Sequence, residues 1–196
     1  MTSESNTVAP RSGQGLARRD FLKVGAGFTL ALTITGTLGV LSGCGEAAKS
    51  PAKSFIFLQE GDLQLFSALT PAVIIDLVPL EGAERKARVS AVLRNLDNTF
   101  STMDLAARQE LRKLLDLLAM APLRYLLTGV GAWNEASIET LQAFLTRWRG
   151  SRFETLNAGG NVLVKLISAS YYVLPASWPA AGYPGPLARM YQAVNS

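Results

Sequence analysis

The chain of 196 residues contains no histidine and a single cysteine, Cys44. Histidine and cysteine supply most ligands of zinc sites, the thiolates of iron–sulfur clusters and the attachment points of c-type haem. Histidine is also the general base in most nucleophilic catalytic arrangements. The composition therefore excludes these metal sites and triads, and it leaves no second cysteine for a disulfide within the chain.

Phosphate-binding loops and acidic clusters are missing too. Gly159-Gly160 lacks the rest of a dinucleotide fingerprint, and Gly129-Val130-Gly131 follows no strand pattern. The aspartates are scattered, and we assign them to helix starts and polar faces: Asp62, Asp76, Asp97, Asp104 and Asp116. We therefore expect no catalytic, cofactor-binding or metal-binding residue, and a protein that is not an enzyme.

The strongest positive signal lies near the start of the chain, where Arg18-Arg19-Asp20-Phe21-Leu22-Lys23 precedes an uncharged run over residues 24–43. Paired arginines followed by Phe-Leu-Lys before an apolar segment are typical of a twin-arginine export signal. Its recognition residues are Arg18, Arg19, Phe21, Leu22 and Lys23. The run is long enough to cross a bilayer, so an uncleaved anchor is the alternative. Its many glycines and threonines favour a signal peptide read by the twin-arginine (Tat) translocase.

Cys44 closes this run in the sequence Leu41-Ser42-Gly43-Cys44, which resembles the lipobox of bacterial lipoproteins. In a lipobox the cysteine is acylated and becomes the new N-terminus. Each buried methylene contributes about 0.8 kcal/mol, so a multiply acylated cysteine holds a domain firmly at a membrane. The alternative is a small residue inside an apolar helix. We predict a periplasmic protein with a signal over residues 1–43, lipid at Cys44, a tether over 44–58 and one domain over 59–196.

The charge balance points away from nucleic acid. The formal net charge is +4, and the residues before Cys44 carry four basic and two acidic side chains. Half of the net charge of the chain therefore belongs to the export signal. We expect no nucleic-acid partner, because no basic footprint remains in the rest of the chain.

Apolar residues at spacings of three and four predict an all-α domain, an irregular bundle of about five helices closed by an extended C-terminal segment rich in proline and aromatic residues. We expect a helix kinked or restarted at Pro71 over 62–77, and further helices over 84–100, 105–120, 135–148 and 153–174, with a helical turn over 123–128. Asp104 and Asn134 are the expected N-caps, and Gly129 ends the turn. The pattern predicts no strand.

Two features of this pattern have two interpretations each. Gly159-Gly160 either bends the last helix or lets another helix approach closely. Arg147, Arg149 and Arg152 either complement the carboxyl end of a helix, where the dipole favours cations, or form a binding patch.

The segment Trp178-Pro179-Ala180-Ala181-Gly182-Tyr183-Pro184-Gly185-Pro186 is expected to be stiff and extended, because its prolines disfavour a helix. Trp178 and Tyr183 either fold back over the domain's own core or dock on a partner, since such rings are efficient interface anchors.

Three parts of this end, Tyr171-Tyr172, Trp178-Pro179 and Gly182-Tyr183-Pro184-Gly185-Pro186, carry a family resemblance. Together with the twin-arginine presequence and the opening helix over 63–77, they resemble the small, subunit-three family of membrane-bound gluconate 2-dehydrogenase and related flavin-dependent sugar and alcohol dehydrogenases. The lipobox is a departure from many members of that family.

The resemblance implies a large flavoprotein partner of the glucose–methanol–choline type, often with a multihaem cytochrome subunit. It implies that the small subunit assists assembly and export of the large one, with no catalytic residue of its own. The residues proposed for partner binding are Trp178, Tyr183, Pro184 and Gly185.

The export route supports the same hypothesis independently, because twin-arginine translocation carries folded cargo and this chain has no recognisable cofactor motif of its own. We therefore expect a non-catalytic subunit that escorts and tethers a periplasmic flavin-dependent dehydrogenase. The alternative is a free-standing periplasmic lipoprotein with a ligand-binding or envelope role.

Overall fold

The computed structural model describes residues 50–77, 79 and 82–185. The twin-arginine residues, Cys44 and the chain from Pro186 onward lie outside the described residues. The predictions made for them are therefore carried by the sequence alone.

The described part of the chain is all-α, as predicted, and contains no strand. Its six α-helices, against about five expected, are α2 (Glu60–Val73), α3 (Gly82–Thr102), α4 (Leu105–Ala119), α5 (Ala121–Thr128), α6 (Ile138–Arg149) and α7 (Glu154–Tyr172). Short 3-10 helices add η1 (Ile75–Leu77), η2 (Trp133–Glu135) and η3 (Pro175–Ser177). The additional helix is α5, which we had expected to be only a turn.

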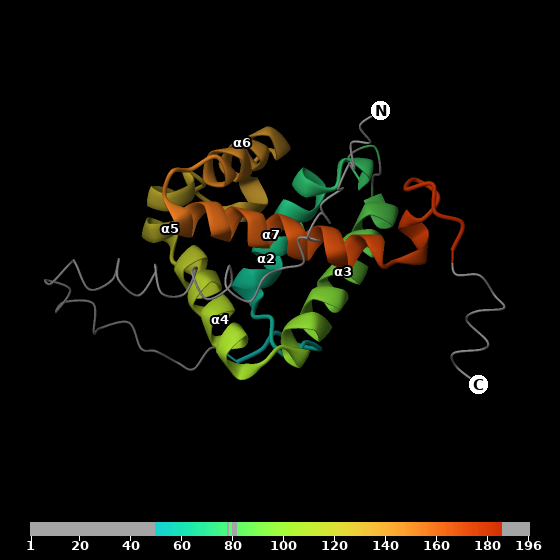
Figure 1. The fold of residues 1–196 in the computed structure, drawn as a ribbon, viewed down its shortest axis with the longest axis horizontal. Helices are drawn as coiled ribbons and strands as arrows, with labels where there is room; N and C mark the ends of the chain where they lie inside the picture. The colour runs from blue at the N-terminus through green and yellow to red at the C-terminus, as the bar shows by residue number, and fades with distance from the viewer. Residues whose placement is uncertain (1–49, 78, 80–81, 186–196) are drawn as a thin grey trace, which may run out of the picture.

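The bundle is organised around α2, which contacts α3, α4, α6 and α7. Figure 1 shows α7 lying across α2 and α3, with α5 near the beginning of α7 and η3 beyond its end. The largest buried side chains come from α2, α3, α6, η2 and the segment before α2: Trp133, Trp148, Phe66, Phe100, Phe144 and Leu58. One hydrophobic core therefore joins all six helices.

The first helix ends earlier than predicted. Pro71 lies in the last turn of α2, which stops at Val73, and the chain then passes through Ile74 into η1. A proline removes one helical hydrogen bond and crowds the preceding turn, so the helix does not continue far beyond it. The predicted extension to Leu77 is a 3-10 turn.

The helix starts show one correct cap and one error. Asp104 is the N-cap of α4 and accepts the backbone N–H of Ala107 at 2.9 Å, as predicted. The prediction for Asn134 was wrong, because α6 begins after Ser137, whose hydroxyl accepts the Thr140 N–H at 3.2 Å. Trp133 is buried in the core and belongs to the separate turn η2, so Asn134 precedes no α-helix.

Gly159-Gly160 serves close packing rather than bending, because α7 is continuous through both residues. A Cβ on Gly159 would lie 3.1 Å from the Trp148 ring, and one on Gly160 would lie 3.0 Å from the Trp148 Cβ. Both glycines are buried against α6. Of the two interpretations of Gly159-Gly160, the close approach of another helix is confirmed, and that helix is α6.

The described part of the expected tether is folded onto the domain. Leu58 is fully buried, and the Asp97 carboxylate of α3 accepts the backbone N–H groups of Ile56, Phe57 and Leu58 at 2.7, 2.8 and 2.9 Å. Residues 52–58 therefore belong to the domain, which begins earlier than the predicted residue 59. The assignment of Asp97 to a polar face was wrong, because it is only 4% exposed and holds this segment in place.

Candidate functional site

The predicted partner-binding segment follows α7 as a series of turns. After η3, the N–H of Ala181 donates to the carbonyl of Ser177 at 3.2 Å, and the N–H of Tyr183 donates to that of Trp178 at 2.9 Å. Gly182 turns the chain with a φ of 66°. The segment is thus not α-helical, as expected, but it is more compact than the extended conformation predicted for it.

Trp178 and Tyr183 pack on each other, with ring centroids 5.3 Å apart in an edge-on arrangement. Neither ring belongs to the hydrophobic core. Gly185 is buried beneath Trp178, where an added Cβ would lie 3.1 Å from the indole ring. Trp178 is half-buried, whereas Tyr183 and Pro184 are exposed. Of the four proposed partner-binding residues, Tyr183 and Pro184 are accessible, and Trp178 and Gly185 mainly support them.

This small aromatic unit is fixed to the helices beneath it. Arg88 of α3 donates to the carbonyl of Ala176 at 2.8 Å, and the buried Ser177 hydroxyl donates to the carbonyl of Leu174 at 2.7 Å. Burial raises the pKa of Tyr171, with the charge of Asp76 as a smaller cause. That phenol therefore stays neutral to a higher pH than an exposed tyrosine does.

Exposed apolar side chains surround the end of α7. Tyr172 is 48% exposed, Val173 62% and Tyr183 48%. Figure 1 shows η3 and the chain after it at the far end of α7 from α5. We call Tyr172, Val173, Tyr183 and Pro184 the α7-end surface. Surfaces of this type, aromatic and weakly charged, are common in the centres of protein interfaces.

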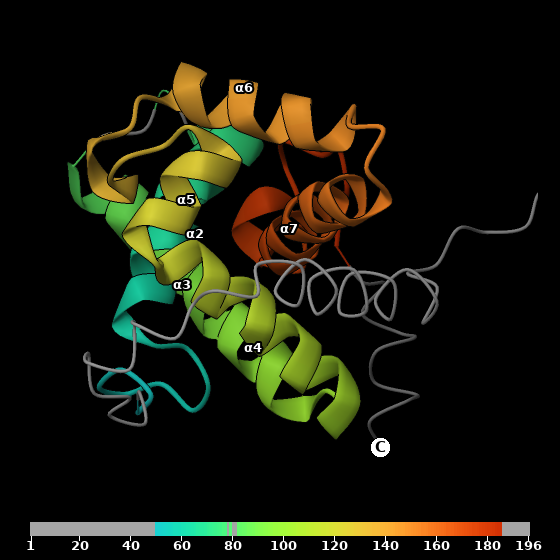
Figure 2. The same cartoon turned by 90° about the vertical axis from the view of Figure 1, so that its left-hand side faces the viewer.

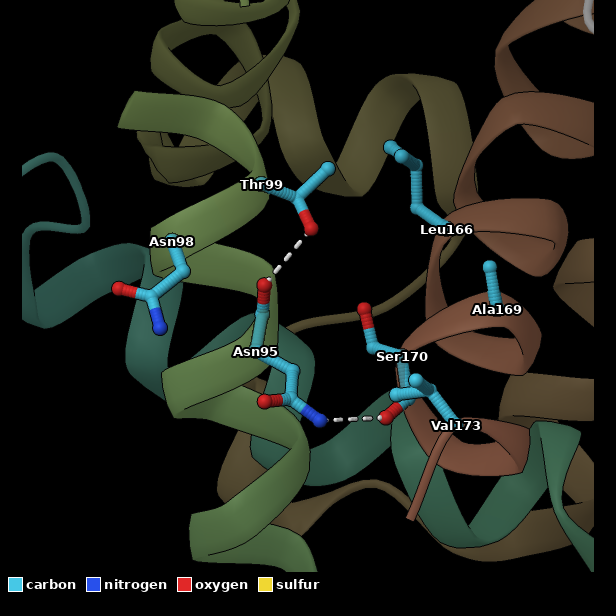
Figure 3. A pocket seen from close by; sticks show the side chains of 7 residues that line it. All are labelled: Asn95, Asn98, Thr99, Leu166, Ala169, Ser170 and Val173. Atoms are coloured by element: carbon cyan, nitrogen blue, oxygen red, sulfur yellow. Dashed lines mark hydrogen bonds between the residues drawn. The ribbon is translucent and has the colours of Figure 1, made fainter. Parts of the chain in front are cut away.

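A pocket of about 310 Å³ lies between α3 and α7 beside this surface. Figure 3 shows its lining residues: Asn95, Asn98, Thr99, Leu166, Ala169, Ser170 and Val173. The Asn95 side-chain amide donates to the Ser170 carbonyl at 3.0 Å and so ties the two helices together. The lining offers amide, hydroxyl and apolar groups but no charge, so it suits a small neutral ligand better than an ionic one.

A second hollow of about 270 Å³ lies where α2, α6 and α7 meet, with Arg149 at its edge. The Gln142 side chain donates to the Ala72 carbonyl at 3.2 Å there. This hydrogen bond joins α2 to α6, so the polar groups of the hollow are partly used in holding the fold.

A partly buried ion network joins α2 to α4. Arg112 donates to both carboxylate oxygens of Asp62 at 2.7 and 2.8 Å and to Asp116 at 2.9 Å. Burial alone would lower the pKa of Arg112, but its hydrogen bonds and the charges of Asp62 and Asp116 together raise that pKa. Asp62 lies in the first turn of α2, as its assignment to a helix start predicted, but it is buried there, with 1% exposed.

The network is structural, because both of its carboxylates are held by the same arginine. The spacing of Arg112 and Asp116 by four residues was a visible sequence signal for part of it. Its link to Asp62, fifty residues earlier, was not visible.

The arginines at the end of α6 are used individually. Arg147 donates to the carbonyl of Thr128 at the carboxyl end of α5, and Arg149 donates to the side chain of Asn161. The Arg152 guanidinium stacks on the Phe153 ring, with its Cζ 5.1 Å from the ring centroid. The helix-end interpretation is confirmed for Arg147, although the helix it complements is α5 rather than its own.

Within the ranges that the structure describes, no group of three or more histidine, cysteine, aspartate or glutamate side chains could hold a metal ion. Of the described helices, none combines the length and the apolar character needed to span a membrane.

Comparison with protein-family models found no match, and neither did comparison with curated proteins or with solved structures.

Proposed function

We propose that this chain is a non-catalytic subunit that escorts a folded flavin-dependent dehydrogenase through the twin-arginine route and holds it at the periplasmic membrane face. The observation that carries the proposal is the α7-end surface, where aromatic and aliphatic side chains are exposed on a rigid support. The sequence supports it through Arg18-Arg19 and the lipobox cysteine Cys44. A multihaem cytochrome would be a further partner.

The geometry of the α7-end surface suits a protein partner. Tyr172 and Tyr183 present large rings of which about half remains exposed, and each packs edge-on against a neighbouring ring. A ring that is already fixed loses little conformational entropy on binding, so more of its contact energy is retained in the complex. Tyr183 is therefore the residue we expect at the centre of the interface.

The escort role is tested by exchanging Arg18 and Arg19 for lysine in the cell that makes the protein. We expect flavin-dependent dehydrogenase activity to accumulate in the cytoplasm while total activity is preserved. Arg11→Lys, in the same presequence, is the matched control and should leave activity in the periplasm. Dehydrogenase that still reaches the periplasm in the double variant would disprove the escort role.

The interface is tested separately with a photo-crosslinking amino acid at position 183. We expect a cross-linked product that contains a polypeptide with bound flavin. The same amino acid at Thr102, an exposed residue at the end of α3, is the control and should yield no such product. A product without flavin at position 183 would argue against a flavoprotein at this surface.

The pocket between α3 and α7 favours a second function, that of a free-standing periplasmic lipoprotein binding a small neutral ligand. Ala169 is exposed at the pocket, so Ala169→Trp would fill it with little effect on the core. The ligand-binding function predicts that this variant loses a small molecule that co-purifies with the unchanged protein. It also predicts that exchanging Arg18 and Arg19 for lysine leaves the dehydrogenase in its usual place. Both results together would favour the ligand-binding function.

A further inference from the structure

The outer face of α5 is apolar and uncovered. Tyr125 is 66% exposed and Leu126 78%, which makes Leu126 the most exposed large apolar side chain of the described residues. Met120, immediately before α5, is 45% exposed, and Pro122 in its first turn is also exposed. The inner side of the helix carries Thr128, which is buried.

A second exposed apolar group lies at the same end of the domain. Phe153, the N-cap residue before α7, is 59% exposed. The end of α6 lies against the end of α5, because the Trp148 indole nitrogen donates to the Leu127 carbonyl at 2.9 Å and Arg147 donates to the Thr128 carbonyl. Phe153 follows α6 closely in the chain, so it is held near α5. Figure 2 shows α5 facing the viewer, with α6 across the top and α7 to the right of α5.

Exposed cations accompany these apolar groups. Arg147, Arg149 and Arg152 are all exposed at the end of α6 and in the loop after it. The Arg152 guanidinium lies over the Phe153 ring, so a cation and an apolar ring are presented at the same place on the surface. The acidic residues nearest to these three arginines in the sequence are Glu139 and Glu154, so cations outnumber acids here.

We propose that this end of the domain, Tyr125, Leu126 and Phe153 with the arginines Arg149 and Arg152, docks on an anionic lipid surface. Apolar side chains would enter the boundary between headgroups and acyl chains, and the guanidinium groups would contact lipid phosphates. The apolar groups project from a helix and a loop, and they line neither of the two pockets described above. That arrangement suits a fluid lipid boundary better than a shaped protein partner.

The inference goes beyond the proposed function, because it concerns the folded domain and requires neither acylation of Cys44 nor a flavoprotein. It also fits that function geometrically. The lipid-facing end and the α7-end surface lie at opposite ends of α7, a helix of 19 residues and hence about 28 Å long. A partner bound at the α7-end surface would then stand away from the membrane.

The experiment measures the depth of labelled positions in vesicles. The full chain carries Cys44→Ser, so that one introduced cysteine takes an environment-sensitive fluorophore. Leu126→Cys and Phe153→Cys report on the proposed lipid face, and Val173→Cys, which is 62% exposed at the opposite end, is the matched control. The vesicles contain phosphatidylglycerol and phosphatidylcholine with brominated acyl chains, which quench only a fluorophore that enters the bilayer.

We expect quenching at positions 126 and 153 to be several times stronger than at 173. Adding Arg149→Gln and Arg152→Gln should lower the partition coefficient onto anionic vesicles, titrated by quenching at position 126, about fivefold per arginine. Neutral vesicles should quench position 126 weakly whether or not the arginines are present. Equal quenching at 126 and 173, no quenching at 126, or no dependence on the arginines would each overturn the proposal. The readout involves no dehydrogenase, so its failure is distinct from failure of the escort role.

Discussion

Gly160 of α7 lies so close to α6 that a Cβ at this position would be 3.0 Å from the Cβ of Trp148. The same added atom would be 3.2 Å from the backbone nitrogen of Arg149. Backbone atoms cannot move aside without moving the helix, so a larger residue at this position would require α6 to shift by a few tenths of an ångström. The crossing places Trp148 in the core and the α6–α7 loop at the end of the domain.

Gly160→Ala should lower the free energy of unfolding by about 1–3 kcal/mol, because the methyl group would separate α6 from α7. Urea or thermal unfolding measures the change. The matched control is Gly61→Ala in α2, where the added Cβ would make an ordinary 3.5 Å contact with Ala119. Alanine is the better helix former, so the control should be neutral or slightly stabilising. Equal effects at the two glycines would contradict the close approach.

Asp97→Leu should release the segment over residues 52–58. The three backbone N–H groups that Asp97 binds would lose an ionised acceptor, at a cost of about 3 kcal/mol or more in total. Hydrogen exchange should show faster exchange at Ile56, Phe57 and Leu58 than in the core of α2. Asp104→Asn is the control, since asparagine caps a helix as well as aspartate does. Unchanged protection over 56–58 would refute the clamp.

Arg112→Leu should destabilise the domain by about 3–5 kcal/mol, because it leaves the buried Asp62 carboxylate without its cation. Adding Asp62→Leu should recover part of that loss, since the uncompensated charge is then removed. A double-mutant cycle measured by chemical denaturation separates the two effects. Additive losses in the cycle would show that the pair is not coupled.

The two buried indoles near α6 should respond differently to replacement by phenylalanine. Trp148 donates to the Leu127 carbonyl at 2.9 Å, whereas the buried Trp133 Nε1 has no hydrogen-bond partner among the described residues. Trp148→Phe should therefore cost about 1 kcal/mol more stability than Trp133→Phe. Thermal unfolding of the two variants makes the comparison, and the opposite order would mean that Trp133 has a partner in solution.

Glu139 should contribute a small pH dependence to stability. Its own backbone N–H and then the Ser137 hydroxyl lower the pKa of Glu139 below the ordinary value. A lowered pKa in the folded state means that the contribution is present above the unfolded pKa and is lost as pH falls through the folded one. Glu139→Gln should flatten the acid side of the stability profile. An unchanged profile would show that this carboxylate is free in solution.

The sequence predicted what depends on neighbours along the chain. The apolar stripes located α3, α4 and α7 to within a few residues, and Asp104 was recognisable as a cap because its partner is only three residues away. The same local reasoning failed at Asn134, where a good cap residue was outweighed by burial of the adjacent Trp133. Propensity is weak beside the burial of a large indole.

The candidate site was only partly predictable. Trp178 and Tyr183 were recognised as candidate interface residues, but their mutual packing over Gly185 depends on a turn that proline and glycine content alone does not specify. The exposed face of α5 escaped notice because residues 123–128 were expected to form only a turn. A helical assignment there would have placed Pro122, Leu126 and Gly129 on one uncharged face.

The sequence by itself determined the helical class of this protein, and it is the basis on which the export and lipid signals are proposed, because each rests on residue types at short spacing. Only the tertiary structure decided which buried charges meet, which glycines permit a helix crossing and which apolar faces remain uncovered. Asp97 binds the backbone of residues 39 to 41 positions earlier, and Arg112 binds Asp62 across 50 positions. Contacts of that range depend on how all the helices pack together, which no single segment encodes.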